Sequence, residues 1–141
     1  MTEPIQSANS TFPANISSLR PILAWIISQI EESPFDQAEL RRIEVALEEA
    51  LVNIIHYAYL DQEGEIEITC NYFPEDQIEI IIKDYGIPFN PLENGQKIDR
   101  MAPIEERTVG GLGISFMKEL MDKVEYSREG NANILTLKKY C

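Results

Sequence analysis

Residues 36–83, DQAELRRIEVALEEALVNIIHYAYLDQEGEIEITCNYFPEDQIEIIIK, contain the change of pattern that decides the fold. From Leu40 to Ala58 apolar residues recur at steps of three and four, the spacing of one buried helix face. From Ile66 onward, apolar and polar residues alternate, which is typical of a half-buried strand. The turn at 74–76 separates two such runs. This stretch therefore predicts a helix up to about Leu60, followed by an antiparallel hairpin.

The flanking residues extend this pattern. A first helix is predicted from Asn15 or Ser17 to about Glu32, and Asp36 is expected to cap the second helix. After the hairpin we expect a third helix over 112–123 and strands over 124–128 and 133–139. Residues 1–14 are expected to be poorly defined apart from a short edge strand at 10–14. Together these elements predict one α+β domain over residues 1–141, a two-layer sandwich of helices packed on one face of a mixed, mostly antiparallel sheet.

The composition excludes several classes of protein. The chain has 24 acidic and 12 basic residues, a formal net charge of −12, so direct binding of nucleic acid is not expected. The apolar run from Ile22 to Ile27 is far too short to span a membrane, and no signal peptide is expected. Two cysteines, Cys70 and Cys141, make neither a disulfide framework nor a zinc site. These features favour a cytoplasmic protein.

Glu49 and Asn53 form the first candidate site. They are four residues apart on the predicted second helix, so they project from one face, and both are expected to avoid its apolar stripe. Asparagine is a poor helix former, which makes a mid-helix position costly. A solvated helix face remains the alternative interpretation.

Two further motifs follow along the chain. Asp84-Tyr85-Gly86 comes at the end of the second hairpin strand, where a carboxylate could accept a hydrogen bond from an exocyclic amine; the alternative is an ordinary turn. Gly110-Gly111-Leu112-Gly113 precedes the predicted third helix, where backbone N–H groups could bind phosphate; the alternative is a flexible hinge. The connection between these motifs, 84–111, is long for a small domain, which is typical of a functional or mobile segment.

The order of these three motifs resembles the N, G1 and G2 boxes of the GHKL ATPase superfamily, and most of all those of the bacterial anti-sigma factor serine kinases. Residues 46–53 are similar to the N box, 84–91 to the G1 box and 110–114 to the G2 box, and the resemblance extends over about 36–139. Two positions depart from it: Tyr57 stands where many members have histidine, and Val109 where related kinases often have arginine.

The resemblance implies a role for each candidate residue. Asn53 would bind Mg²⁺, and Glu49 would be the general base. Asp84 would hold the adenine amino group, with Gly86 admitting the base, and the loop between Phe89 and Gly110 would be a lid. The phosphates would lie against Gly110, Gly111, Leu112 and Gly113, with Arg107 and Thr108 reaching the γ-phosphate. His56 is expected to be a partly buried helix residue without a role in the site.

The function that follows from the resemblance is that of an ATP- and Mg²⁺-dependent serine-protein kinase. Its substrate would be a serine of a small anti-sigma-factor antagonist protein, and it would also sequester a sigma factor, with a homodimer as a further expectation. One alternative is a non-catalytic protein that uses ATP to switch between protein partners. Another is an interaction domain with a decayed pocket.

Overall fold

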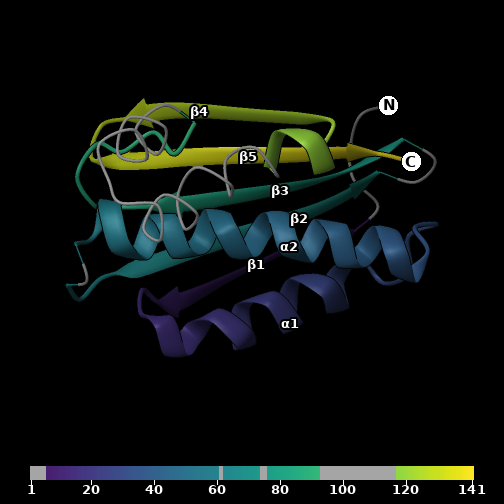
Figure 1. The fold of residues 1–141 in the computed structure, drawn as a ribbon, viewed down its shortest axis with the longest axis horizontal. Helices are drawn as coiled ribbons and strands as arrows, with labels where there is room; N and C mark the ends of the chain where they lie inside the picture. The colour runs from purple at the N-terminus through teal and green to yellow at the C-terminus, as the bar shows by residue number, and fades with distance from the viewer. Residues whose placement is uncertain (1–5, 61, 74–75, 93–116) are drawn as a thin grey trace, which may run out of the picture.

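Helices lie on one side of a five-stranded sheet in the computed structural model, which describes residues 6–60, 62–73, 76–92 and 117–141 (Figure 1). The strands are β1 (Gln6–Pro13), β2 (Glu65–Phe73), β3 (Gln77–Asp84), β4 (Lys123–Glu129) and β5 (Ala132–Tyr140). They lie in the order β1-β2-β3-β5-β4, and each neighbouring pair of these described strands is antiparallel. The predicted α+β two-layer class is confirmed, while the mixed character expected of the sheet is absent from its described strands.

The helices begin where the sequence offers caps. Asn15 accepts a hydrogen bond from the Ser18 backbone and opens the short 3₁₀ turn η1 (Ile16–Ser18), which continues into α1 (Leu19–Ile30). Asp36 caps α2 (Gln37–Asn53) by accepting from the Glu39 backbone N–H at 2.8 Å, and the Glu39 carboxylate accepts from the Asp36 backbone N–H. This reciprocal pair is a capping box, so the predicted start of the second helix is confirmed.

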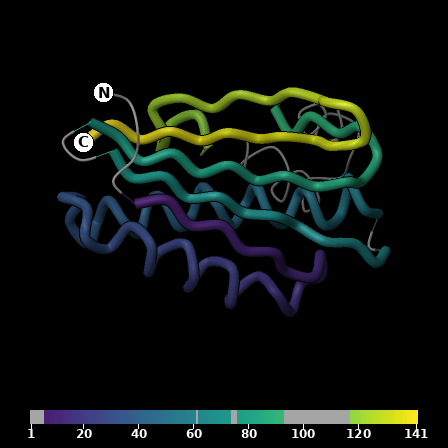
Figure 2. Tube along the Cα trace, turned by 180° about the vertical axis from the view of Figure 1, so that it is seen from behind, coloured from purple at the N-terminus to yellow at the C-terminus, as the bar shows by residue number. Residues whose placement is uncertain are grey.

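The core lies between the sheet and these helices. One face of each central strand carries isoleucine or leucine, and so do the buried stripes of α1 and α2. Fully buried side chains of this layer include Ile22, Leu23, Ile26, Ile43, Leu47, Leu51, Ile66, Ile68, Ile78, Ile80 and Ile82. Seen from the opposite side, the strands pass in front of α2, and α1 is visible below β1 (Figure 2). Burial of this apolar area is the main term that holds α1 and α2 in place.

The described helix ends differ from the predicted ones. The α-helical part of α2 stops at Asn53, and residues Ile54–Ala58 form the π-helical turn η2, in which the Tyr59 N–H donates to the Ile54 carbonyl at 3.2 Å. α1 ends at Ile30, before the predicted Glu32. Within the described residues the third helix ends at Leu120, because Lys123 already pairs with Lys138 as the first residue of β4.

The N-terminal strand is longer than the sequence suggested. β1 pairs with β2 over eight residues, from Gln6↔Tyr72 to Pro13↔Glu65, instead of forming a short strand at 10–14. Its inward positions, apart from Phe12, are small or polar residues, so the strand lacks the apolar alternation by which strands are recognised. Pairing with β2 stabilises it instead.

No helix in the described ranges combines the length and apolarity that crossing a membrane would require.

Candidate functional site

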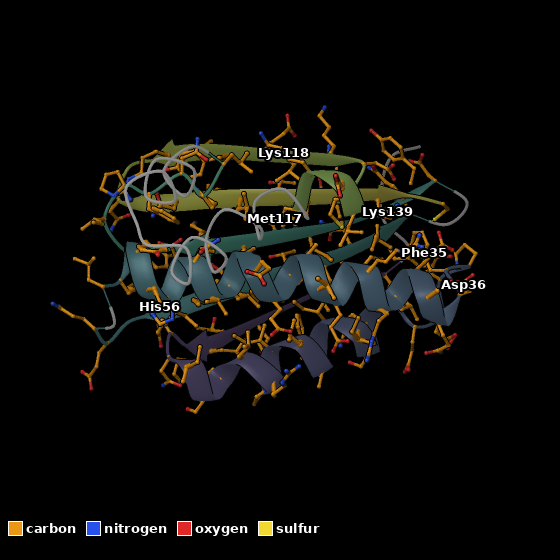
Figure 3. The ribbon with its side chains drawn as sticks, in the orientation of Figure 1. Phe35, Asp36, His56, Met117, Lys118 and Lys139 are labelled. Atoms are coloured by element: carbon orange, nitrogen blue, oxygen red, sulfur yellow. The ribbon has the colours of Figure 1, made fainter. Side chains whose placement is uncertain are left out.

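The end of α2 and the end of β3 meet at one end of the sheet. Both ends lie at the left in Figure 1. The Ile87 N–H, just after β3, donates a hydrogen bond of 2.9 Å to the carbonyl of Ala58, the last residue of η2. Asp36, at the start of α2, is labelled at the opposite end of the helix from His56 (Figure 3). The structure therefore packs the helical turn that follows Asn53 against the residues that follow Asp84, some thirty residues later in the chain.

Asn53 is the last residue of α2, and its side chain is completely buried, with 0% exposure. Neither its Oδ1 nor its Nδ2 has a hydrogen-bond partner within the part of the chain that the structure describes. The expectation that Asn53 avoids the apolar face of the helix was wrong: Asn53 lies three residues after Ala50 on α2 and is buried like it. A buried amide without a partner costs folding free energy, which points to a ligand for it.

Glu49 lies one turn before Asn53 and is half-buried. Burial, and second the charge of Glu48, raise the pKa of the Glu49 carboxyl. Raised carboxyl pKa values occur at functional sites and also in structural clusters of charge. The predicted pair on one helix thus consists of a half-buried carboxyl of raised pKa and a buried amide without a partner among the described residues.

Asp84 is the last residue of β3 and is only 1% exposed. Its Oδ1 accepts hydrogen bonds from the Gly86 backbone N–H at 3.0 Å and from the Asn133 Nδ2 at 2.8 Å. Burial raises the pKa of Asp84, while these two hydrogen bonds and the Arg128 guanidinium oppose the increase. Asp84 is therefore both the turn residue of the alternative interpretation and a buried acceptor at the end of β3.

Gly86 has a structural reason to be glycine. A Cβ atom at this position would lie 2.4 Å from the Ala58 carbonyl oxygen, at the end of η2. Its own carbonyl accepts a hydrogen bond from the Arg128 guanidinium at 2.9 Å. The close approach that requires glycine is thus to the helix end, and the predicted contact with a nucleotide base stays a prediction.

Aromatic rings join the two motifs. The Tyr57 ring, on η2, lies with its centroid 5.4 Å from that of Phe89, whose backbone N–H is held by Asn133. Single π-turns in helices occur frequently at functional sites. His56, next to Tyr57, is half-buried as expected, and its ring lies edge-on to the Tyr57 ring at 6.4 Å.

Asn133 was not among the residues selected from the sequence. It lies on β5, directly opposite Asp84, and is 2% exposed. A signal was present: in the alternating pattern of this strand, Asn133 shares the inward face of Leu135 and Leu137. A polar residue at an inward strand position is a candidate for a structural or functional hydrogen bond.

The remaining candidates lie outside the described residues. They are the proposed lid after Leu92 and the phosphate-binding residues Arg107, Thr108, Gly110, Gly111, Leu112 and Gly113. Their roles stay predictions.

The residues that are described fit a magnesium ion. Mg²⁺ prefers oxygen ligands and is commonly held by one or two protein groups together with substrate phosphates and water. The Asn53 amide oxygen is such a ligand, and it is buried with no competing partner in the described structure. Across the described ranges no group of three or more His, Cys, Asp or Glu residues is arranged around a metal position. The described residues thus fit a Mg²⁺ ion that takes one ligand from the protein and the others from substrate phosphates and water.

Comparison with known proteins identifies the fold and the relatives. The histidine kinase-like ATPase domain family matches residues 12–139. A serine-protein kinase RsbW of Bacillus mycoides is 26% identical, over 98% of this chain and 88% of its own length.

Two solved structures share the fold. One contains the RsbU and RsbW domains of Rv1364c from Mycobacterium tuberculosis, with a TM-score of 0.65, 16% identity and coverage of 96% of this chain and 32% of that longer chain. The other is the SiaB–SiaC complex from Pseudomonas aeruginosa, with a TM-score of 0.57 and 13% identity. The match covers 99% of this chain and 91% of that chain.

Proposed function

The chain belongs to the histidine kinase-like ATPase domain family, and on this premise we propose that it is an ATP- and Mg²⁺-dependent serine-protein kinase of the anti-sigma factor type. The observation that carries the proposal is the pairing on α2 of an unsatisfied buried amide, Asn53, with a carboxyl of raised pKa, Glu49. The similarity to proteins named serine-protein kinase RsbW supports it.

In this proposal Asp84 accepts a hydrogen bond from the exocyclic amine of adenine, and the Asn53 amide oxygen binds Mg²⁺. Bound Mg²⁺ would supply neutralisation of the phosphate charge, which matters in a chain with a formal net charge of −12. The glycines of 110–113, together with Arg107 and Thr108, are proposed to contact the phosphates.

Glu49 is proposed to be the general base. Its carboxylate takes the proton of a serine hydroxyl on the protein substrate while the serine oxygen forms a bond to the γ-phosphorus. The bond between that phosphorus and the β–γ bridging oxygen breaks, and ADP leaves with the electron pair. A carboxyl that is partly withdrawn from water holds this proton more readily than an exposed one, because burial raises its pKa.

The proposed substrate is a serine of a small anti-sigma-factor antagonist protein, and a sigma factor is the second proposed partner. A protein partner is supported by one structure of the same fold, which was solved as a complex of SiaB with SiaC. A cytoplasmic location and a homodimer belong to the same proposal.

Incubation with γ-labelled ATP, Mg²⁺ and candidate antagonist proteins tests the activity. The wild type should transfer label to a serine, and Glu49→Gln should lower the rate by about 10²- to 10⁴-fold while Mg-ATP binding stays near the wild-type value. Glu44→Gln is the matched control, since it makes the same change elsewhere on α2, and it should retain transfer.

The second candidate is a non-catalytic protein that uses ATP to choose between partners. Tyr57 favours this second function. Its ring packs against Phe89 at a position where many anti-sigma factor serine kinases have histidine, so the site differs here from theirs. If Glu49→Gln and the wild type transfer label equally, Glu49 is not the base. If the wild type binds ATP but labels no antagonist, the non-catalytic function becomes the better one.

A further inference from the structure

The Asn133 side chain uses all of its hydrogen-bonding capacity within the protein. Its Nδ2 donates to the Asp84 Oδ1 at 2.8 Å and to the Ile87 carbonyl at 2.8 Å. Its Oδ1 accepts from the Phe89 N–H at 3.2 Å and from the Tyr126 hydroxyl. An asparagine amide has two N–H donors and two acceptor lone pairs, so these four bonds leave none for a ligand.

The Asp84 carboxyl is held through one oxygen. Both of its described hydrogen bonds, from Gly86 and from Asn133, end on Oδ1, and neither uses Oδ2. The Gly86 bond is local, spanning two residues of one turn, whereas the Asn133 bond comes from the neighbouring strand. Asp84 and Asn133 are register partners in the β3–β5 ladder, so the rigid sheet determines the position of the donor.

From this geometry we propose that Asn133 is a positioning residue that directs the Asp84 Oδ2 toward the adenine amino group and thereby sets the preference for adenine nucleotides. The inference rests on the proposed binding of ATP at Asp84. Asn133 itself does not touch the nucleotide, because its amide is saturated by protein groups.

The same amide also shapes the loop that follows Asp84. By bonding the Ile87 carbonyl and the Phe89 N–H, Asn133 holds both sides of Pro88 against β5. Phe89 in turn contacts the Tyr57 ring on η2. One buried side chain of β5 thus connects the acceptor, its loop and the end of the helix that carries Asn53.

The charged and titratable groups around Asp84 come from β4 and from the residue that follows η2. Arg128 of β4 lowers the pKa of Asp84. Tyr59, which follows η2, and Tyr126 of β4 interact electrostatically with Asp84, and the pKa of each tyrosine is raised mainly by burial. The donors that oppose the effect of burial on Asp84 are Asn133 and the Gly86 N–H. Removal of the Asn133 donor should therefore raise the pKa of Asp84.

The test compares Mg-ATP with Mg-ITP, in which a carbonyl replaces the amino group of the base. Asn133→Asp keeps the size of the side chain but loses the Nδ2 donor. It should lower the ATP-over-ITP affinity ratio by about ten-fold, as expected when a hydrogen bond to a charged group is misaligned. Asn131→Asp, the same change at an exposed position of the same hairpin, should leave the ratio within two-fold.

A pH series provides a second readout. In Asn133→Val, which removes the donor without placing a second carboxyl beside Asp84, the pH below which ATP affinity falls should lie higher than in the wild type. Asn131→Val should not move that pH. If Asn133→Asp weakens ATP and ITP equally and the pH profile of Asn133→Val is unchanged, Asn133 supports only the fold and the inference is overturned.

Asn133→Thr and Asn133→Val form an independent pair, in case the aspartate variant does not fold. The two side chains have nearly the same shape and suit a strand, and only threonine has a hydroxyl donor for Asp84. Threonine should retain more of the ATP preference than valine, and an equal loss in both would overturn the inference. A wild type that binds no ATP would overturn both proposals, whereas one that binds ATP selectively without transferring phosphate would refute only the kinase.

Discussion

Asn53 and Glu49 both lower the stability of the free protein. Asn53 places an amide with no described partner in the core, and Glu49 holds a carboxyl whose ionised form is disfavoured by burial and by Glu48. A side chain that is costly to bury is more readily explained by function than by folding. These two residues therefore allow function and stability to be separated by single substitutions.

Asn53→Leu should make the free protein more stable and abolish its use of Mg²⁺. Leucine is similar in size and has no polar atom to leave unsatisfied, so the free energy of unfolding should increase by about 1–3 kcal/mol. Urea denaturation in the presence of a chelator measures this change. Calorimetry should then show that Mg²⁺ no longer strengthens ATP binding. Val52→Leu, at the preceding half-buried position, is the control for the added volume.

If the wild type binds ATP equally well with and without the chelator, Asn53 is not a Mg²⁺ ligand.

Glu48→Gln should shift the pH dependence of phosphoryl transfer. The charge of Glu48 is the second cause of the raised pKa of Glu49, so its removal should lower that pKa. The base must be ionised to accept a proton, so the acidic limb of the rate profile should move to lower pH. Glu44→Gln, one turn earlier on α2, should leave the profile in place. An unmoved limb in Glu48→Gln would exclude Glu49 as the titrating base.

The raised pKa of Glu49 also predicts how the free energy of unfolding changes with pH. Because the pKa of Glu49 is higher in the folded than in the unfolded chain, ionisation of this group lowers stability above the folded pKa. The effect disappears as the pH falls below the unfolded pKa. Glu49→Gln should therefore be at least as stable as the wild type at neutral pH.

At the scale of elements, α2 connects a stabilising end to a functional end. Its capping box lies at Asp36 and Glu39, while Asn53 and the π-helical turn lie at the other end. Seventeen residues separate the two ends by roughly 25 Å at the rise of an α-helix. Changes at the cap should thus affect the helix without reaching the site directly.

Asp36→Ala should lower the free energy of unfolding by about 0.5–2 kcal/mol, the usual cost of a lost N-cap. Mg-ATP affinity should stay within two-fold of the wild type as long as the protein is folded. Chemical denaturation and calorimetry measure the two quantities, and Gln37→Ala, at the next and exposed position, is the control. A large loss of affinity at full folding would show that the cap and the site are coupled.

At the scale of the whole molecule, net charge opposes folding. The formal net charge is −12, and the described ion pairs have N–O distances between 3.7 and 3.9 Å, with side chains that are mostly exposed. Exposed pairs of this kind contribute little, so repulsion among the excess carboxylates is the larger electrostatic effect.

The melting temperature should accordingly rise between 20 and 200 mM sodium chloride, since the screening length falls to roughly 7–8 Å in this range. Scanning calorimetry measures the change. Replacing two exposed acidic residues distant from the site, Glu31→Gln and Glu32→Gln, should raise the melting temperature at low salt and reduce its dependence on salt. A melting temperature that falls with salt would mean that favourable ion pairs outweigh the repulsion.

Much of the fold could be predicted from the sequence because the signals are local. The step of three and four along 40–58, the alternation in the hairpin and the Asp36 cap each act within about four residues, so they predicted α2, β2 and β3 correctly. β1 was underestimated because its hydrogen bonds come from β2, more than fifty residues away, and its own side chains carry little apolar signal. The order of the three motifs also lay in the sequence, and the family match over 12–139 confirms the resemblance drawn from it.

The environment of the site was decided only by the tertiary structure. The sequence by itself determined that Glu49 and Asn53 share a helix and that Asp84 ends a strand, since these are properties of neighbouring residues. It did not reveal that the Asn53 amide is buried without a described partner, that Gly86 packs on the Ala58 carbonyl, or that Asn133 holds Asp84. Those facts depend on strand register and on helix packing, which join residues up to 49 positions apart. Burial, and with it the pKa of a carboxyl and the cost of an amide, exists only once those distant segments are packed together.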